Sequence, residues 1–257
     1  MAKQAIMKLR VKRSLSIIIP AYNEAKRLPA SLKKVREYLS AAHWEFAEVV
    51  VVDDGSVDNT VQLARDAGVR VLQNPGNRGK GYSVRHGMLE AKGEWALFTD
   101  ADLSSPIGEV EKLWSAVVRE RAQVAVGSRA VDRSLVGVHQ PILREAVGRV
   151  FNAVMRLVTG LDFKDTQCGF KLFQTSAGRE VFSRQQLDGF GFDVEVLFIA
   201  RKLGLPAVEV PVRWDNVEGT KVSLLLGFAA FLDLLRVRRN ALQGKYDRSR
   251  RRDGVRT

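Results

Sequence analysis

Cysteine is almost absent from this chain: Cys168 is the only one among 257 residues. A single cysteine excludes an internal disulfide, and it fits a reducing compartment such as the cytoplasm. No apolar run reaches the roughly 18 residues that a membrane-spanning helix needs. The basic N-terminus is not followed by the long apolar region of a signal peptide. From the sequence we therefore expect a cytoplasmic protein without a spanning helix.

The two most common phosphate-binding loops are missing as well. No G-x-G-x-x-G follows a strand-like segment, and no G-x-x-x-x-G-K-[ST] is present, although GNRGKG at 76–81 comes close. The histidines His43, His86 and His139 have no metal-ligand spacing, so we interpret them as structural or surface residues. Cys168 has no base partner in the sequence, so we assign it to packing. A bound nucleotide would need acids and a metal ion to hold it.

The net charge of +12 is concentrated at the two ends of the chain. Residues 1–13 carry five Lys or Arg and no acid, and residues 234–257 carry nine Lys or Arg and two Asp, which leaves 27 basic and 27 acidic residues between them. Basic ends on a neutral body favour an anionic partner, either lipid headgroups or nucleic acid. The alternative is that the ends are simply solvated.

Apolar segments and amphipathic segments alternate through the first 130 residues. We predict strands within 15–24, 48–60, 69–74, 94–102 and 123–129, and helices within 27–42, 59–68, 80–93 and 110–122. The strands are apolar on both faces, and Pro20 is expected to end the first of them. This pattern predicts an α/β fold with a mostly parallel sheet flanked by helices, in which ligands bind at the carboxyl ends of the strands.

The second half of the chain is less regular. The pattern predicts an amphipathic helix within 144–160, a turn-like polar stretch at 165–173, a helix that begins near Asp193 and a strand at 207–214. A last helix, predicted over 223–242, is apolar in its first turns and basic in its final two. It is either an interfacial helix, whose arginines suit anionic headgroups, or a core helix packed on the sheet.

Acidic residues stand at three of the predicted strand ends, and Glu24 is the acid at the first of them. Asp100 and Asp102 follow a buried strand one residue apart, so their carboxylates point to the same side and a cation is expected beside them. Mg²⁺ commonly takes one or two carboxylates together with phosphate oxygens. Asp53 and Asp54 follow VVVV, where an acid can accept hydrogen bonds from a ribose or base. Helix capping is the alternative for both pairs.

These stretches resemble the successive motifs of a known family. SIIIPAYNE, VVVVDDGSVDNT, NRGKGYSVRHGM and FTDADLSSP are similar to family 2 glycosyltransferases, which have the GT-A fold. The later stretches GSRA, DTQCGFKLF, FDVEVL and VRWDNVEGTKVS resemble dolichyl-phosphate β-glucosyltransferases, with dolichyl-phosphate mannosyltransferases close behind. The resemblance covers about residues 14–240. DTQCGFKLF with a downstream W-x-x-x-x-G-[ST]-K is its most specific part.

The resemblance implies a role for each matched position. The nucleotide sugar would be bound by Pro20, Tyr22, Glu24, Asp53, Asp54, Lys80, Asp100, Ala101 and Arg213. A metal ion, Mg²⁺ or Mn²⁺, would lie at Asp100 and Asp102, and the acceptor phosphate at Ser128, Arg129 and Arg144. Catalysis would involve Asp102, Gln167, Asp193 and Lys221. Asp165 would accompany Gln167, Glu195 would face the sugar with Asp193, and Trp214 would belong to a mobile basic segment over the diphosphate.

The implied reaction is a metal-dependent, inverting transfer of glucose from UDP-glucose to a polyprenyl (dolichyl-type) phosphate, with a β-linked product. The metal would act as a Lewis acid on the leaving diphosphate. A phosphate acceptor is largely dianionic at pH 7 and needs no general base, so Asp193 is interpreted mainly as an orienting or electrostatic residue. GDP-mannose is the alternative donor, and a sugar acceptor such as a polysaccharide is the third possibility.

The sequence divides into a basic tail at 1–13, a glycosyltransferase domain at 14–221, an amphipathic helix at 222–243 and a basic tail at 244–257. We expect peripheral binding to an anionic membrane surface, on the cytoplasmic face, with no nucleic acid and no obligate protein partner. A hypothesis of another class is a non-enzymatic protein that binds a membrane or nucleic acid through its tails. The tails lack interleaved aromatics, and the acids cluster at strand ends, which counts against that hypothesis.

Overall fold

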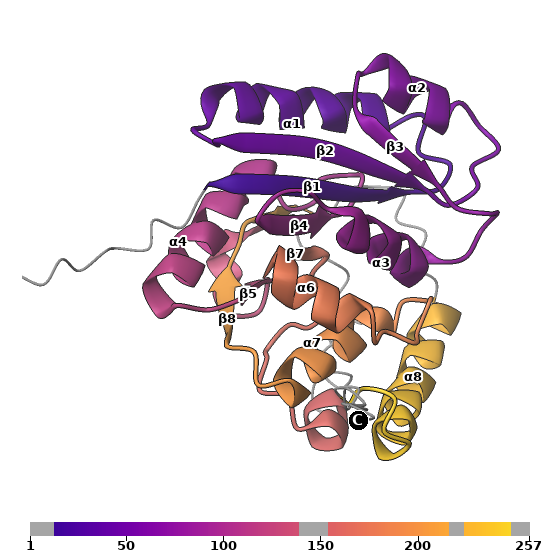
Figure 1. The fold of residues 1–257 in the computed structure, drawn as a ribbon, viewed down its shortest axis with the longest axis vertical. Helices are drawn as coiled ribbons and strands as arrows, with labels where there is room; N and C mark the ends of the chain where they lie inside the picture. Colours follow the sequence, from indigo (N-terminus) through magenta and orange to yellow (C-terminus); the bar gives the residue numbers. More distant parts are fainter. Residues whose placement is uncertain (1–12, 139–153, 216–223, 248–257) are drawn as a thin grey trace, which may run out of the picture.

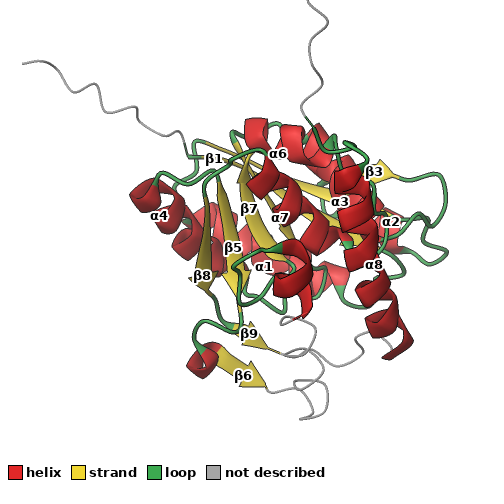
Figure 2. Ribbon diagram, turned by 90° about the horizontal axis from the view of Figure 1, so that it is seen from below, coloured by secondary structure: helices red, strands yellow, loops and turns green. Residues whose placement is uncertain are grey.

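A seven-stranded sheet forms the centre of the computed structural model, which describes residues 13–138, 154–215 and 224–247 (Figure 1). Its strand order is β3-β2-β1-β4-β7-β5-β8. The strands are β1 (Ser14–Ala21), β2 (Phe46–Asp53), β3 (Arg70–Gln73), β4 (Trp95–Thr99), β5 (Val124–Ser128), β7 (Phe170–Gln174) and β8 (Ala207–Pro211). Two short strands, β6 (Val136–Val138) and β9 (Trp214–Asp215), pair apart from this sheet (Figure 2).

Helices cover both faces of the sheet, which explains why its strands are apolar throughout. In β1, Ile18 packs into one hydrophobic core, while Ile17 and Ile19 pack into the other. The first core is closed by α3 (Lys80–Glu90), α6 (Thr175–Phe182), α7 (Phe192–Lys202) and α8 (Leu224–Leu242). The second is closed by α1 (Leu28–Ala41), α2 (Thr60–Asp66) and α4 (Val110–Glu120). Because side chains alternate along a strand, burial on both faces requires these continuous apolar runs.

The predicted fold class is confirmed, and the five strands and four helices predicted for the first 130 residues are present. Short 3-10 turns lie at Ile107–Glu109 and Arg133–Leu135, and residues 154–159 are helical. The helix α6 was not anticipated from the sequence. Pro20 does not end β1, which continues for one more residue to Ala21. A proline is tolerated there because the pairing of β1 with β4 has already ended at Ile18.

The prediction of a turn-like stretch at 165–173 was wrong for its second half. Phe170–Gln174 forms β7, which is inserted between β4 and β5 and runs antiparallel to both. The other pairs in the sheet are parallel. Lys171 hid the strand because a charge in a central strand is unusual, and its side chain is completely buried here. The antiparallel direction places the chain just before β7 at the carboxyl end of β4, where Phe170 pairs with Thr99.

The last helix, α8, packs against α7. Leu234 and Val237 are buried in the first core, whereas Leu232, Leu235 and Leu242 are 50%, 61% and 85% exposed. The described part of α8 therefore contributes to the core through one face and exposes leucines on the other, and both alternatives for this helix stay predictions. No helix in the described residues is long and apolar enough to cross a membrane.

Candidate active site

The site lies where the carboxyl ends of β1, β2 and β4 meet. β1 is flanked by β2 on one side and β4 on the other, so the sheet order reverses at this strand. Ligands of α/β sheets bind in the crevice at such a reversal. Asp53 ends β2 beside Ala21, and Asp100 follows β4 directly. Loops from the antiparallel β7 and the first turn of α7 complete the same edge.

The two carboxylates of the D-x-D stretch each have a cation beside them. Lys80, the first residue of α3, lies with its Nζ 2.5 Å from Oδ1 of Asp100. Nη1 of Arg27 is 3.9 Å from Oδ2 of Asp102. The other oxygen of Asp102 accepts hydrogen bonds from the backbone N–H and the hydroxyl of Ser104 at 3.0 and 2.9 Å. The expected cation is thus supplied by two separate side chains.

Arg27 is a site residue that the sequence analysis missed. Its Nε and Nη2 donate to the carboxylate of Glu24 at 2.7 and 2.5 Å. The hydrogen bond to Glu24 and the nearby charges of Asp102 and Asp100 raise the pKa of Arg27, against the opposing effect of burial. In the sequence, Arg27 looks like an ordinary residue before a helix. Its place opposite the D-x-D stretch depends on the pairing of β1 with β4.

Gly169 lies directly against the carboxylate of Asp100. A Cβ added to Gly169 would be 2.7 Å from Cγ and 2.8 Å from Oδ1 of Asp100, closer than real Cβ contacts come. The backbone at Gly169 therefore fixes where the Asp100 carboxylate can point. The pairing of Phe170 with Thr99 brings the C-G-F of DTQCGFKLF next to the D-x-D stretch.

A buried ion pair forms the floor of the site. Nζ of Lys171, on β7, contacts Oδ1 of Asp193, on the first turn of α7, and donates to the carbonyl of Cys168 at 2.7 Å. Burial raises the pKa of Asp193, while Lys171 and Lys80 act in the opposite direction. Burial would also lower the pKa of Lys80, but Asp100 and Asp193 outweigh it and hold that pKa above its ordinary value. The sequence analysis gave Lys171 no role.

Asp53 and Asp54 are both buried and bind backbone groups. Asp53 accepts from the N–H of Gly55 and Ser56, which turns the chain after β2. Asp54 accepts from the N–H groups of 78 and 79 at 3.0 and 2.8 Å and from Nδ2 of Asn74 at 2.8 Å. Asp54 therefore shapes the loop that leads to Lys80. The predicted nucleotide contacts of this pair stay a prediction.

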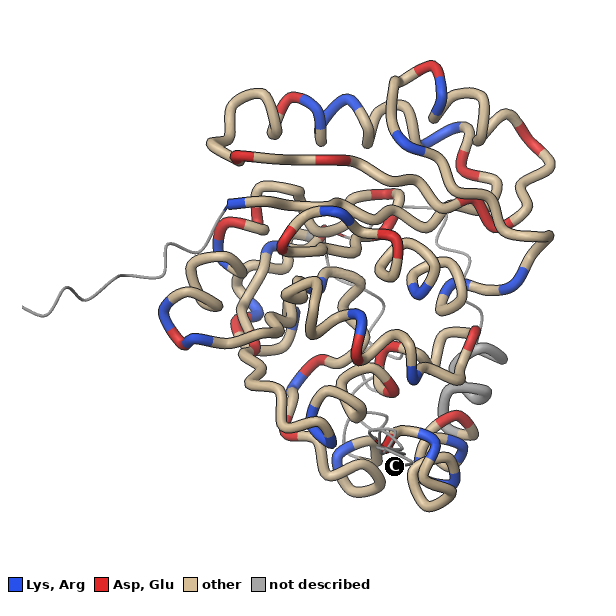
Figure 3. Tube along the Cα trace, viewed as in Figure 1, with Lys and Arg blue, Asp and Glu red and all other residues tan. Residues whose placement is uncertain are grey.

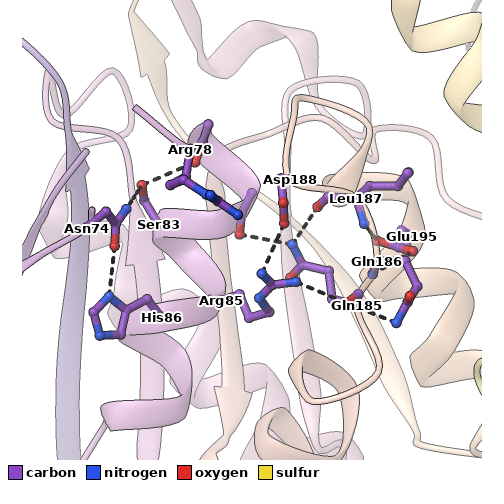
Figure 4. A network of polar contacts seen from close by, with 12 residues as sticks. Asn74, Arg78, Ser83, Arg85, His86, Gln185, Gln186, Leu187, Asp188 and Glu195 are labelled. Atoms are coloured by element: carbon purple, nitrogen blue, oxygen red, sulfur yellow. Dashed lines mark hydrogen bonds and ion pairs between the residues drawn. The ribbon is translucent and has the colours of Figure 1, made fainter. Parts of the chain in front are cut away.

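A polar network continues from this loop across α3 to α7 (Figure 4). His86 contacts Oδ1 of Asn74 through Nδ1 at 2.8 Å, which agrees with its interpretation as a structural residue. Arg85 pairs with Asp188 at 3.1 Å. Glu195, expected to face the sugar, instead accepts from the N–H groups of 186 and 187 and from the hydroxyl of Tyr246 at 2.6 Å. This network fixes the loop at 185–188 against α3.

The residues predicted to bind the acceptor phosphate lie at the end of β5. Ser128 is buried, and its hydroxyl accepts from the N–H groups of 130 and 131. Arg129 is held by the buried Asp165 through Nε at 2.6 Å and Nη2 at 2.9 Å, and it lies 5.4 Å from the ring centre of Trp214. Burial would raise the pKa of Asp165, but Arg129 outweighs it and holds that pKa below its usual range. The structure brings Ser128, Arg129 and Asp165 together. Arg144 lies outside the described residues.

The remaining predicted residues are placed around the rim. Tyr22 is 38% exposed, Ala101 is buried between the two acids, and Pro20 is half-buried. Gln167 is half-buried, and its N–H donates to Oδ1 of Asp165. Arg213 is exposed and pairs with Asp215 at 3.0 Å. Lys221 lies outside the described residues.

The two carboxylates of the D-x-D stretch fit a divalent cation whose remaining coordination positions are filled by a bound phosphate ligand and waters. Among the described side chains no three His, Cys, Asp or Glu converge as a metal site. Asp100 and Asp102 offer two hard carboxylate donors, and the Lys80 ammonium already occupies a cation position on Asp100. Mg²⁺ and Mn²⁺ accept this kind of site because phosphate oxygens and waters supply their other ligands.

The chain belongs to glycosyl transferase family 2, whose model matches residues 16–182. It is therefore a glycosyltransferase, and the hypothesis of a non-enzymatic binding protein is wrong. The chain is 38% identical to a dolichyl-phosphate beta-glucosyltransferase of Drosophila melanogaster over 81% of this chain and 69% of that protein. It is 34% identical to that of Homo sapiens over 91% of this chain and 78% of that protein. The predicted family resemblance is confirmed.

Solved structures agree on the fold. Glucosyl-3-phosphoglycerate synthase from Mycobacterium tuberculosis, in a complex with Mn²⁺, UDP and glucosyl-3-phosphoglycerate, superposes with a TM-score of 0.65 at 20% identity, over 88% of this chain and 80% of that one. The same protein with Mn²⁺, UDP-glucose and phosphoglyceric acid also gives 0.65, over 88% and 79%. At this identity the similarity establishes the GT-A-like arrangement of sheet and helices.

Proposed function

We propose that this glycosyltransferase moves glucose from UDP-glucose to a polyprenyl phosphate, with a divalent metal ion at Asp100 and Asp102. The observation that carries the proposal is the cluster of Asp100, Asp102, Lys80 and Asp193 at the sheet reversal. The relatives named as dolichyl-phosphate beta-glucosyltransferases support glucose as the transferred sugar and a dolichyl-type phosphate as the acceptor. GDP-mannose remains the alternative donor, and the test below distinguishes the two.

The diphosphate of the donor needs positive partners on the chain. Lys80 lies beside Asp100 and Arg27 beside Asp102, and they provide an ammonium and a guanidinium, which bind phosphate well. Tyr22 presents an exposed ring at the end of β1, suitable for stacking on a base. When bound, the metal ion would neutralise charge on the leaving diphosphate. Arg213, and Lys221 outside the described residues, stay predicted contacts of the diphosphate.

The acceptor phosphate is assigned to Arg129. Its Nε and Nη2 face Asp165, so the guanidinium is fixed in a plane and retains N–H groups for a phosphate. Its side chain is 29% exposed. Burial of the Ser128 hydroxyl makes Arg129 the stronger of the two candidates at the end of β5. Arg144 stays a prediction.

Asp193 is assigned to orient the reacting groups. Lys171 contacts one carboxylate oxygen of Asp193, and the charge of Asp193 also acts on Lys80, the partner of Asp100. A phosphate acceptor brings its own negative oxygen at neutral pH, so the reaction needs no proton removed by Asp193. In-line attack by that oxygen on the anomeric carbon breaks the bond to the diphosphate and inverts the configuration. An α-linked donor then gives a β-linked product.

The test is a lipid-extraction assay. Purified chain is incubated with Mn²⁺ or Mg²⁺, a short polyprenyl phosphate in detergent, and labelled UDP-glucose or GDP-mannose in parallel. Label in the organic phase with UDP-glucose alone supports the proposal, and Asp102→Ala should abolish it. Asp132→Asn, at an exposed aspartate outside the site, is the matched control and should retain activity. Label with GDP-mannose alone would replace the donor, and no label with either would refute the lipid-phosphate acceptor.

We also propose that the outer face of α8 binds an anionic membrane surface. Leu232, Leu235 and Leu242 are exposed on this helix together with Arg236 and Arg239. Lys and Arg gather along its C-terminal part (Figure 3). A helix with leucines and arginines on its outward face fits the boundary between headgroups and acyl chains.

The place of α8 supports this partner. A Cβ at Gly191 would be 2.7 Å from Cγ of Asp233, so the helix lies against the start of α7, two residues before Asp193. A bilayer on α8 would therefore lie near the site and its lipid acceptor. By contrast, the start of β1 lies at the amino ends of the parallel strands, whereas Asp100 lies at their carboxyl ends. A membrane at the start of β1 would therefore lie away from the site. Binding on the cytoplasmic face stays a prediction.

Vesicle co-sedimentation tests the membrane proposal. The chain should sediment with vesicles that contain phosphatidylserine and much less with pure phosphatidylcholine. Replacing both Leu232 and Leu235 by Ser should weaken sedimentation at least about tenfold, since each buried leucine contributes roughly 1.5–3 kcal/mol. Val118→Ser removes an exposed apolar side chain from α4 and serves as the control. Equal binding of the double variant and the control would refute the role of α8.

A further inference from the structure

The two cations beside the D-x-D carboxylates come from segments far apart in the chain. Lys80 begins α3, and Arg27 precedes α1. Nζ of Lys80 contacts Asp100, and the charge of Asp193 also acts on this ammonium group, whereas Arg27 contacts Glu24 and lies 3.9 Å from Asp102. Counting these six residues with Lys171 gives four carboxylates and three cations, so the cluster is close to neutral before any ligand binds.

In such a cluster a metal ion must compete with the side-chain cations for the carboxylates. A divalent cation that binds Asp100 competes with the Lys80 ammonium for the same carboxylate, since Nζ is only 2.5 Å from Oδ1. Both cations also have chemistry that suits a diphosphate, because ammonium and guanidinium groups bind phosphate oxygens directly. Their side chains are 21% and 26% exposed, so both reach solvent and neither is fully buried in the core. A diphosphate that arrives can therefore draw them from the carboxylates.

We propose that Lys80, assisted by Arg27, occupies the D-x-D carboxylates as a counter-cation until a nucleoside diphosphate takes it over, so that metal binding is held back in the absence of nucleotide. This proposal rests on the assignment of the D-x-D stretch as the metal and diphosphate site. It adds that Lys80 has two partners in turn: Asp100 before the nucleotide binds and the diphosphate afterwards. The metal and nucleotide affinities are then coupled through the side chain of Lys80 as well as through the metal–phosphate bond.

The coupling has a sign that a variant can reveal. Lys80→Met keeps the length of the side chain and removes the competing charge. It should tighten the binding of Mn²⁺ alone by about tenfold, because an adjacent positive charge lowers the affinity of a carboxylate for a proton by roughly 10- to 1,000-fold and opposes a metal ion at the same oxygens in the same way. The same variant should weaken the binding of UDP. The factor by which UDP raises Mn²⁺ affinity should therefore be smaller than in the wild type.

The experiment measures the free Mn²⁺ signal by electron paramagnetic resonance, on the full chain, with and without UDP. Arg78→Met is the matched control, because it removes the same charge two residues earlier, from a side chain that lies 5.1 Å from the ring centre of Tyr82. Lys80→Arg keeps the charge and should restore weak binding of Mn²⁺ alone. Circular dichroism confirms that each variant is folded.

Tighter binding of Mn²⁺ alone to Lys80→Met, with Arg78→Met unchanged, supports the proposal. Equal or weaker binding to Lys80→Met overturns it, as does equal tightening in both variants, which would indicate a general charge effect. No Mn²⁺ binding to the wild type, even with UDP, would overturn it together with the metal assignment. No assay here needs a sugar or a lipid acceptor, so a wrong donor or acceptor in the proposed function would leave these outcomes intact.

Discussion

Replacing Gly169 by Ala tests how tightly the chain before β7 fixes the D-x-D stretch. The added Cβ would be 2.7 Å from Cγ of Asp100, and an Asp side chain is too short to move aside without rotating about its own Cα–Cβ bond. Gly169 does not have the left-handed φ that favours glycine, so alanine is compatible with its backbone. The substitution therefore acts through the contact with Asp100.

Two opposing effects set the size of the change in stability. Alanine at a compatible position stabilises by roughly 0.4–1 kcal/mol through the unfolded chain. A methyl forced into a filled space costs about 1–3 kcal/mol. We expect a net loss of roughly 1–2 kcal/mol in the free energy of unfolding. Rotation of Asp100 would also misorient one carboxylate of the proposed metal site, and changing a group that orients a metal ligand typically costs about 10- to 100-fold in metal affinity.

Urea unfolding measures the stability change, and electron paramagnetic resonance measures Mn²⁺ binding in the presence of UDP. Gly189→Ala is the control, because nothing lies within 4 Å of its added Cβ. In the Asp100→Ala background the Gly169→Ala substitution should cost much less stability, because the clashing carboxylate is gone. Equal costs in both backgrounds, or wild-type Mn²⁺ affinity in Gly169→Ala, would refute the reasoning.

Three further predictions concern buried polar groups. Lys171→Met should lower the free energy of unfolding by about 3–5 kcal/mol, because it leaves Asp193 buried without its partner; adding Asp193→Leu should recover much of this in urea unfolding, and no recovery would contradict the pairing. Burial raises the pKa of Cys168 to about 11, so the folded chain holds more protons than the unfolded chain and stability should fall between about pH 9 and 11 by up to roughly 1.4 kcal/mol per pH unit. Urea titrations at several pH values should show this decline flattened in Cys168→Ala, and an unchanged slope would count against the shift. Tyr246→Phe should cost about 1–3 kcal/mol in thermal unfolding, because Glu195 loses a buried hydrogen bond, and a change below roughly 0.3 kcal/mol would be the contrary result.

The first half of the fold was predictable because each strand and helix has a recognisable pattern in its own stretch of sequence. Continuous apolar runs such as VVVV require burial on both faces, and the helices between them show a 3.6-residue period. The placement of Asp53, Asp100 and Asp102 at one edge of the sheet was predictable for a similar reason: they lie at strand ends, and the carboxyl ends of parallel strands share one edge. The alternation did not extend to β7, where Lys171 breaks the apolar pattern.

Contacts between distant segments could not be predicted in this way. Arg27 carries no local signal, and its position opposite Asp102 follows from the pairing of β1 with β4. Lys171 fits a central strand because Asp193, 22 residues later, supplies its counter-charge. Glu195 follows Asp193 by two residues on a helix, but the helical turn directs it to Tyr246 and away from the site.

The amino-acid sequence by itself determined the class of fold, the acidic strand ends and the family, because these depend on periodicity and on motifs that are contiguous in the chain. The tertiary structure decided the partners of those acids: Lys80 for Asp100, Arg27 for Asp102 and Lys171 for Asp193. The physical reason is that an ion pair needs its two groups within a few ångströms. That distance is set by strand order and direction, above all by the antiparallel insertion of β7, and not by separation along the chain.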